Sequence, residues 1–141
     1  MKKIVLIIIG VSLSLMADFT RNDTTQVVTD SKTQLHWKDD AIGSPMTWTE
    51  AINHCESLTF ATHSDWRLPN IKELTSLVDD SKTSPAIDTN VFEHTTSTTA
   101  YWSSTTSAGT ANYAWYVGSR GNQERYLKSV SYYVRCVRVG Q

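Results

Sequence analysis

The sequence predicts an α+β domain, because its helix-like and strand-like segments are segregated along the chain. Two consecutive helix patterns occupy residues 47–58 and 70–78, and short runs rich in Val, Thr, Tyr and Trp lie before and after them. An α/β fold would instead alternate strands with helices. We therefore expect two helices packed on small antiparallel sheets, with the N- and C-terminal strands close together.

Each helix pattern begins with a capping box. Thr47 is followed three residues later by Glu50, and Asn70 by Glu73, so each pair can satisfy backbone N–H groups of the first turn. Apolar residues then recur at helical spacing, which predicts one buried face for each helix. These residues are Trp48, Ala51, Ile52, Cys55 and Leu58 in the first helix, and Ile71, Leu74, Leu77 and Val78 in the second.

The remaining segments have the pattern of strands. Residues 26–29 and 35–37 flank the segment 30–33, Asp-Ser-Lys-Thr, which favours a hairpin turn. A long loop over residues 79–99 follows the second helix. Further strands are expected at residues 100–103, 113–117, 124–127 and 132–139.

Residues 1–17 have the pattern of a signal peptide. Lys2 and Lys3 precede an almost unbroken apolar run that ends at Ala17, a small residue suited to cleavage. As a helix the run would be about 21 Å long, shorter than the roughly 30 Å hydrocarbon core, although an uncleaved membrane anchor is the alternative. We expect cleavage after Ala17, one domain over residues 18–141 with its core at 26–139, and a periplasmic or secreted location.

Charge is unevenly distributed along the chain. Residues 18–112 hold six Lys/Arg against thirteen Asp/Glu, whereas residues 113–141 hold five Lys/Arg against one Glu. This basic segment either meets a sulfated glycan or an acidic lipid, or neutralises the acidic part of its own domain. A net-acidic exported chain argues against nucleic acid as a partner.

Cys55 and Cys136 are the only two cysteines. In an oxidising compartment they most simply form one disulfide. The closed loop of about 80 residues would be worth about 4–5 kcal/mol in the chain-entropy treatment. The alternative is a reactive or metal-binding thiol pair, which neither a CxxC spacing nor clustering with histidines supports.

Five blocks of the sequence resemble one family. The blocks are Leu35-His36-Trp37, the helix pattern from Trp48 to Leu58, Asp65-Trp66-Arg67-Leu68-Pro69-Asn70 with Glu73-Leu74, Tyr101-Trp102-Ser103-Ser104-Thr105, and Val134-Arg135-Cys136-Val137-Arg138. In this order they are similar to the Lcl C-terminal domain family, named for the Legionella collagen-like adhesin. The resemblance covers about residues 26–139.

The resemblance implies a C-type-lectin-like fold in which a helix-to-last-strand disulfide matches Cys55 and Cys136. For the adhesin it implies a trimeric head that engages sulfated glycosaminoglycans. This chain has no collagen repeat, and it lacks the Glu-Pro-Asn, Gln-Pro-Asp and Trp-Asn-Asp triplets with which calcium-dependent lectins hold sugar. Its first turn has Lys-Thr-Gln-Leu at residues 32–35, where the family usually has Thr-Gly-Leu. We therefore expect this chain to share the fold of the family, and we expect its ligand to follow the family less closely.

The charged and aromatic residues of the shared blocks are interpreted as structural. Trp66 is expected in the core, and Arg67 as a buried cation that needs a carboxylate, with Glu73 the nearest candidate. A functional role for the Asp-Trp-Arg block is the alternative. The expected structural residues are Asp65, Trp66, Arg67, Glu73, Tyr101, Trp102, Arg135 and Arg138.

Ligand binding is expected from the aromatic and basic residues after position 112. Alternation along a strand puts Tyr113 and Trp115 on one face and Tyr116 on the other, and one or two of these rings are expected to line a groove. If the ligand is anionic, the nearby basic side chains would bind it. The candidate residues are Arg120, Arg125, Lys128, Tyr113, Trp115 and Tyr116.

Neither a metal site nor a catalytic site is expected. Asp79, Asp80 and Asp88 offer hard oxygens to a calcium ion, but their spacing fits no EF-hand and a solvated acidic loop is the preferred interpretation. The four histidines show no metal-ligand spacing. No nucleophile elbow, HExxH or phosphate loop is present, while a formylglycine-type enzyme would need a redox-active cysteine pair. A carboxylate-pair hydrolase stays open because proximity in the fold is invisible in a sequence.

The sequence thus favours an exported, non-catalytic module that binds glycan or another envelope or surface polymer. The basic C-terminal segment favours an anionic polymer. The alternative is a structural or protein-interaction domain of the bacterial envelope, with an enzyme third.

Overall fold

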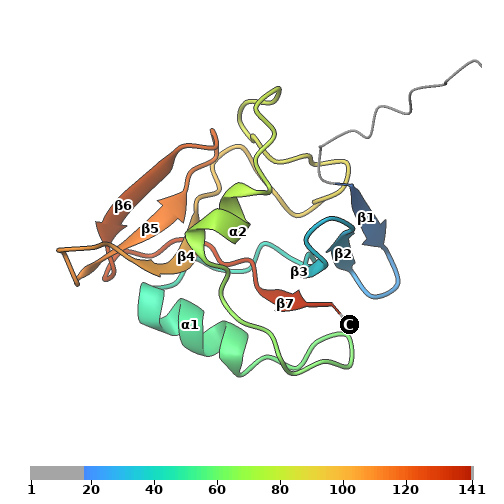
Figure 1. Cartoon of the computed structure of the whole chain (residues 1–141), viewed down its shortest axis with the longest axis horizontal. Coiled ribbons are helices and arrows are strands. Elements are labelled where there is room, and N and C mark those ends of the chain that lie inside the picture. Colours follow the sequence, from blue (N-terminus) through green and yellow to red (C-terminus); the bar gives the residue numbers. More distant parts are fainter. Residues whose placement is uncertain (1–17, 141) are drawn as a thin grey trace, which may run out of the picture.

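The computed structural model describes residues 18–140 and consists of two antiparallel sheets, two helices and one disulfide. One sheet has the order β1-β2-β3-β7 and the other β4-β5-β6. Figure 1 shows the two sheets on opposite sides, with α2 between them and α1 along the lower edge. The expected mixture of helices and small antiparallel sheets is confirmed. The bounds are β1 Phe19–Asn22, β2 Val27–Asp30, β3 Leu35–Lys38, α1 Trp48–Glu56, α2 Ile71–Thr75, β4 Tyr101–Thr106, β5 Tyr113–Val117, β6 Gln123–Leu127 and β7 Val137–Val139.

The β2–β3 hairpin forms at the expected turn. Asp30 closes this turn, because its carboxylate accepts hydrogen bonds from the backbone N–H of Lys32 at 2.9 Å and the hydroxyl of Thr33 at 2.7 Å. Such aspartate side chains compete with the strand ladder and favour a reversal of the chain. The inward-facing side chains of the hairpin, Val28, Leu35 and Trp37, belong to the core cluster that also contains Leu74 of α2.

Both helices begin where their capping boxes predicted. The backbone N–H of Thr47 donates to Glu50 Oε2 at 2.8 Å, and that of Asn70 donates to Glu73 Oε1 at 2.9 Å. The second helix is shorter than expected, because α2 ends at Thr75. Val78 instead forms an isolated antiparallel bridge with Ile87, so the chain leaves the helix to pair with the following loop.

The terminal strands differ from the prediction in two ways. β1 was not expected, and it lies at the opposite edge of its sheet from β7, with β2 and β3 between them. The last strand is only three residues long, because Tyr132 and Tyr133 form isolated bridges with Met46 and Tyr101 before the chain reaches β7. The first and last strands therefore share a sheet but are not neighbours.

The predicted disulfide is confirmed. Cys55 on α1 is joined to Cys136, which directly precedes β7, with a Cα–Cα distance of 5.5 Å. The bond lies in a second core cluster with Ala51, Trp66 and Trp102, all of them buried. It thus connects α1 to the four-stranded sheet. The expected signal peptide lies outside the described residues, and within residues 18–140 no helix is long and apolar enough to cross a membrane.

Candidate functional site

The β5–β6 hairpin separates its aromatic residues onto two faces. Ala114 is paired with Tyr126 and Tyr116 with Glu124, so these four side chains point to one face. Trp115 is paired with Arg125 and points to the other face, together with Tyr113. The predicted alternation of Tyr113 and Trp115 against Tyr116 is what the register of this hairpin shows.

Four aromatic rings form a cluster of edge-to-face and tilted contacts that extends from the core to the surface on the Tyr116 face. Tyr132 lies in the middle, with ring centroids 4.7 Å from Trp102, 4.6 Å from Tyr116 and 6.5 Å from Tyr126. Trp102 is fully buried, Tyr132 is half-buried, and Tyr126 is 47% exposed. The rigid core therefore supports an exposed tyrosine ring from below.

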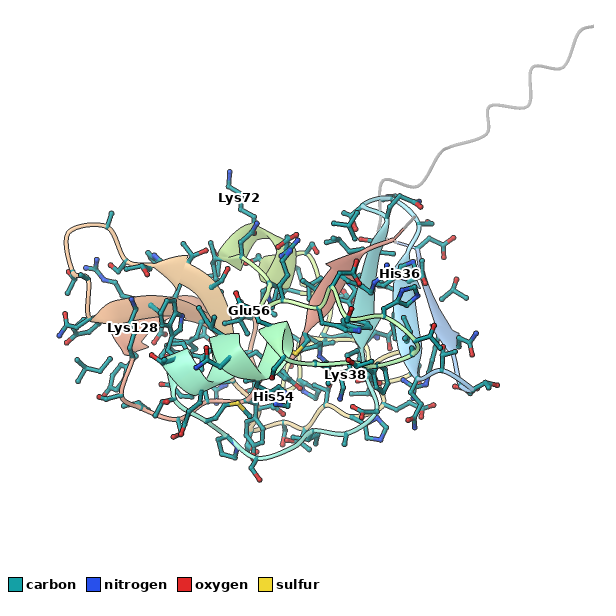
Figure 2. The ribbon with its side chains drawn as sticks, turned by 90° about the horizontal axis from the view of Figure 1, so that it is seen from below. His36, Lys38, His54, Glu56, Lys72 and Lys128 are labelled. Carbon is teal, nitrogen blue, oxygen red and sulfur yellow. A yellow bond between two sulfur atoms is a disulfide. The ribbon has the colours of Figure 1, made fainter. Side chains whose placement is uncertain are left out.

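Trp48 and Lys128 extend this surface toward the start of α1. The Trp48 indole N–H donates to the carbonyl of Ser103 at 2.9 Å, which fixes the ring. Lys128 Nζ lies 3.9 Å above the centre of that ring and 3.0 Å from the Thr106 hydroxyl. Figure 2 shows Lys128 beside α1, at one end of the molecule. We define the aromatic surface as Trp48, Tyr116, Tyr126, Lys128 and Tyr132.

Polar groups surround the rings. The Tyr116 hydroxyl donates to Glu124 Oε2 at 2.8 Å, and the Asn122 amide donates to Glu124 Oε1 at 2.7 Å. The bond from Tyr116 holds the pKa of Glu124 below its ordinary value. Burial, followed by the bond to Glu124, raises the pKa of Tyr116. The exposed ring of Tyr126 lies on the same face of β6 as the ionised carboxylate of Glu124. Such a ring can stack on an apolar ligand face, and the polar groups beside it can hydrogen-bond to the edge of that ligand.

The three basic candidates do not form one patch. Lys128 belongs to the aromatic surface, whereas Arg125 is on the opposite face of β6, where it donates to the Ser107 hydroxyl at 3.1 Å. Arg120 is exposed in the turn between β5 and β6, at the other end of β6 from Lys128. The expectation that the three act together on one ligand has no geometric support.

A comparison with known protein families identifies the family of this chain. The family description for the Lcl C-terminal domain matches residues 26–138. This chain belongs to the Lcl C-terminal domain family. The family is associated with adhesins and is not a known enzyme family, so membership indicates an adhesin-like surface module. A comparison with curated proteins finds no match.

Within this Lcl C-terminal domain, Arg135 lies in a buried ionic cluster. Its guanidinium group pairs with the fully buried Asp39 and donates to the Tyr101 hydroxyl at 3.0 Å. Arg21 of β1 pairs with the same carboxylate, and His94 Nδ1 lies 2.9 Å from the Asp39 carbonyl. Burial opposes ionisation of Asp39, but the charges of Arg135 and Arg21 prevail and hold its pKa below the ordinary value.

The arginines Arg67 and Arg138 are also paired with carboxylates. Arg138 is buried and donates to Asp65 at 2.7 Å, and Arg67 makes a two-pronged pair with Glu73 at 2.7 Å for each bond. Arg67 was expected to be buried, but its side chain is 40% exposed. Glu73 also caps α2, so the side chain of Arg67 lies along the surface to meet it.

The acidic loop contains a basic residue between its carboxylates. Lys82 Nζ lies 3.9 Å from Asp79 and 3.9 Å from Asp88. Among residues 18–140, no group of three or more His, Cys, Asp or Glu side chains is arranged to hold a metal ion. Asp80 is exposed at the same turn.

Sequence reasoning missed three members of the aromatic surface. Tyr126 was counted only as part of a strand, although its position two residues after Glu124 places it on the Tyr116 face. Trp48 was assigned to a buried helix face, and Tyr132 to a continuous last strand. Tyr132 reaches Tyr126 because the chain after β6 turns back and pairs with Met46, and Trp48 reaches Lys128 because α1 begins directly after that pairing.

Proposed function

We propose that this chain is an exported, non-catalytic binding module whose aromatic surface recognises sugar rings of a glycan or another envelope or surface polymer. The proposal rests on the exposed ring of Tyr126, which belongs to an aromatic cluster that reaches the core through Tyr132. A preformed aromatic face loses little conformational entropy on binding, and it suits the apolar C–H face of a sugar ring. Family membership supports a surface role.

The same proposal includes a C-type-lectin-like fold and passage through an oxidising compartment. The helix-to-strand disulfide between Cys55 and Cys136 supports both. The presence of the first and last strands in one sheet also supports the fold assignment.

A glycan array tests the sugar-binding role. The wild-type protein should bind a restricted set of glycans, and Tyr126→Ser should weaken that binding at least tenfold, as stacking contacts of about 1–1.5 kcal/mol and lost burial predict. Val139→Ser is the matched control, because Val139 is the other large exposed apolar residue among residues 18–140 and is 53% exposed on β7. Equal binding by the two variants would contradict the proposal.

Lys128 is proposed to favour anionic polymers at this surface. Lys128→Gln should weaken binding to a charged glycan several-fold and reduce its salt dependence, because exposed charges are screened over about 8 Å at physiological ionic strength. Arg125→Gln removes the same charge from the opposite face of β6 and serves as the control. The cation–π contact with Trp48 is worth about 0.5–1 kcal/mol, so Lys128→Gln should lower stability only slightly. A larger effect of Arg125→Gln would place the ligand on the Trp115 face.

A protein-interaction role is the second candidate, and β6 is the feature that favours it. β6 is an edge strand with exposed residues 123–126. Because Gly118 pairs with Asn122 and Asn112 with Lys128 through backbone bonds, the main-chain groups of Gln123 and Arg125 point away from β5. Such an edge can add a strand from a partner. Arg125→Pro would remove one outward N–H group and should abolish partner binding if this role is correct, while leaving glycan binding intact.

A further inference from the structure

One face of β6 carries an acid, an aromatic ring and a base in a row. Glu124 and Tyr126 lie two residues apart in this strand, so they point to the same face. The backbone N–H of Lys128 donates to the Asn112 carbonyl at 2.9 Å, so the pairing with β5 continues past the end of β6 and Lys128 points to that face as well. Neighbours on one face of a strand are about 7 Å apart, which places the Tyr126 ring between a negative and a positive charge. We call Glu124, Tyr126 and Lys128 the β6 row.

The negative end of the β6 row is held in place and keeps acceptor positions free. Glu124 Oε2 accepts from the Tyr116 hydroxyl at 2.8 Å, and Oε1 accepts from the Asn122 amide at 2.7 Å. The bond from Tyr116 lowers the pKa of Glu124, so the carboxylate is ionised at neutral pH. Each carboxylate oxygen has two lone pairs, so acceptor positions remain after these bonds. Glu124 is exposed and can offer them to a ligand that lies on Tyr126.

The positive end of the β6 row is held in place in a similar way. Lys128 Nζ lies 3.0 Å from the Thr106 hydroxyl and 3.9 Å above the centre of the Trp48 ring. An ammonium group carries three N–H donors, so a donor remains for a ligand after these two contacts.

The two charges of the β6 row are not neutralised by the domain itself. Neither Glu124 nor Lys128 forms a salt bridge with another side chain in the part of the chain that the structure describes. A ligand would therefore meet attraction for an anion at one end of the row and repulsion at the other. Two like unit charges about 7 Å apart in water change an affinity by about threefold, and by more where a bound ring displaces the water.

We propose that the β6 row selects polymers in which anionic and neutral sugar units alternate, and that Glu124 rejects polymers that are charged on every unit. A neutral ring would lie on Tyr126 and donate its hydroxyl or amide N–H groups to Glu124. The anionic group of the next unit would lie at Lys128. This inference rests on the proposed function, because it names the class of ligand that the aromatic surface takes.

A purely structural role for Glu124 is the alternative, because its carboxylate also orients Tyr116. The variant Glu124→Gln separates the two roles. It keeps an amide oxygen that can accept from the Tyr116 hydroxyl, and it removes the charge. Loss of a structural role would lower the melting temperature and weaken the binding of every ligand to the same extent. Loss of charge selection would instead change the ratio of affinities for two ligands of different charge pattern.

The test is isothermal titration calorimetry at low salt with two oligosaccharides of equal length. One is tetragalacturonate, which carries a carboxylate on every ring, and the other is a tetrasaccharide that alternates glucuronate with glucose. The wild-type protein should bind the alternating tetrasaccharide at least threefold more tightly, although it carries half the charge. Glu124→Gln should bind tetragalacturonate about threefold more tightly than the wild type does and should lose most of the preference. Glu56→Gln is the matched control, because it removes the same charge from an exposed residue at the other end of α1 from Trp48.

The inference is overturned if the wild-type protein binds tetragalacturonate as tightly as the alternating tetrasaccharide, or if Glu124→Gln leaves the ratio of the two affinities unchanged. The proposed function survives either result when Tyr126→Ser weakens the binding of both oligosaccharides. If the folded protein binds neither oligosaccharide, the inference is also overturned, and the glycan array alone then decides the proposed function.

Discussion

Asp39 connects three separate parts of the chain through one buried carboxylate. It pairs with Arg21 of β1 and with Arg135 before β7, and its backbone carbonyl contacts His94 of the long loop. Arg135 has no other carboxylate partner among residues 18–140, and its Nε atom has no hydrogen-bond partner there. Removing the charge of Asp39 would leave a buried guanidinium uncompensated.

Asp39→Asn should therefore lower the free energy of unfolding by about 3–5 kcal/mol, the usual cost of breaking a buried ion pair from one side. Urea denaturation monitored by tryptophan fluorescence would measure it. Asp40→Asn is the matched control, because Asp40 is partly exposed and pairs with Lys38, which predicts a loss below about 1 kcal/mol.

The stabilisation that Asp39 provides depends on pH and is lost at low pH. The folded-state pKa of Asp39 is lowered, so its stabilisation is present above its unfolded pKa of about 3.9 and is lost as the pH falls below it. The stability difference between wild type and Asp39→Asn should shrink from pH 5 toward pH 2. A difference that stays constant would show that Asp39 acts through packing rather than charge.

At the scale of elements, α2 depends on its cap. A helix of five residues is too short to be stable by itself, and its N-terminus is held by Asn70 Oδ1 accepting from the Glu73 backbone N–H at 2.9 Å. Asn70→Ala should cost about 1 kcal/mol by thermal or urea unfolding. Asn53→Ala, at an exposed position within α1, should not destabilise the protein. Equal effects would mean that α2 is held by packing alone.

Some helix and strand boundaries are set by residues close in the sequence, whereas others depend on contacts with distant residues. Both helix starts and the β2–β3 turn were predictable, because capping and turn chemistry act within three residues. The end of α2 and the break before β7 were not, since they depend on bridges from Val78 to Ile87 and from Tyr132 to Met46. β1 was also missed, although its pairing is local: it forms a hairpin with β2, and Asn22 Oδ1 accepts hydrogen bonds from the backbone N–H groups of Thr24 and Thr25 in the turn.

At the scale of the whole molecule, one disulfide closes a loop with a sequence separation of 81 residues. Replacing both cysteines by alanine should lower stability by about 4 kcal/mol and the melting temperature by 10 °C or more. Differential scanning calorimetry would measure the shift. Non-reducing peptide mapping should recover Cys55 linked to Cys136 from the native protein, and two free thiols would contradict the account.

Only part of the proposed binding surface could be predicted from the sequence. Tyr116 and Lys128 were identified because they lie in the aromatic and basic C-terminal segment. The structure places Arg125 on the opposite face of β6 from Lys128, because side chains alternate along a strand, and Arg120 in the turn at the other end of β6. Trp48 contacts Lys128, and Tyr132 contacts Tyr126, only in the folded protein. The spacing of residues in the sequence does not predict these contacts.

Ligand recognition on the aromatic surface can be tested by NMR chemical-shift mapping with the glycan that binds most strongly on the array. We expect the largest shifts at the Trp48 indole N–H and at the backbone of residues 126–128 and 132, with little change at Trp115 or His36. Shifts centred on the outward N–H groups of Gln123 and Arg125, or on the Trp115 face, would contradict it.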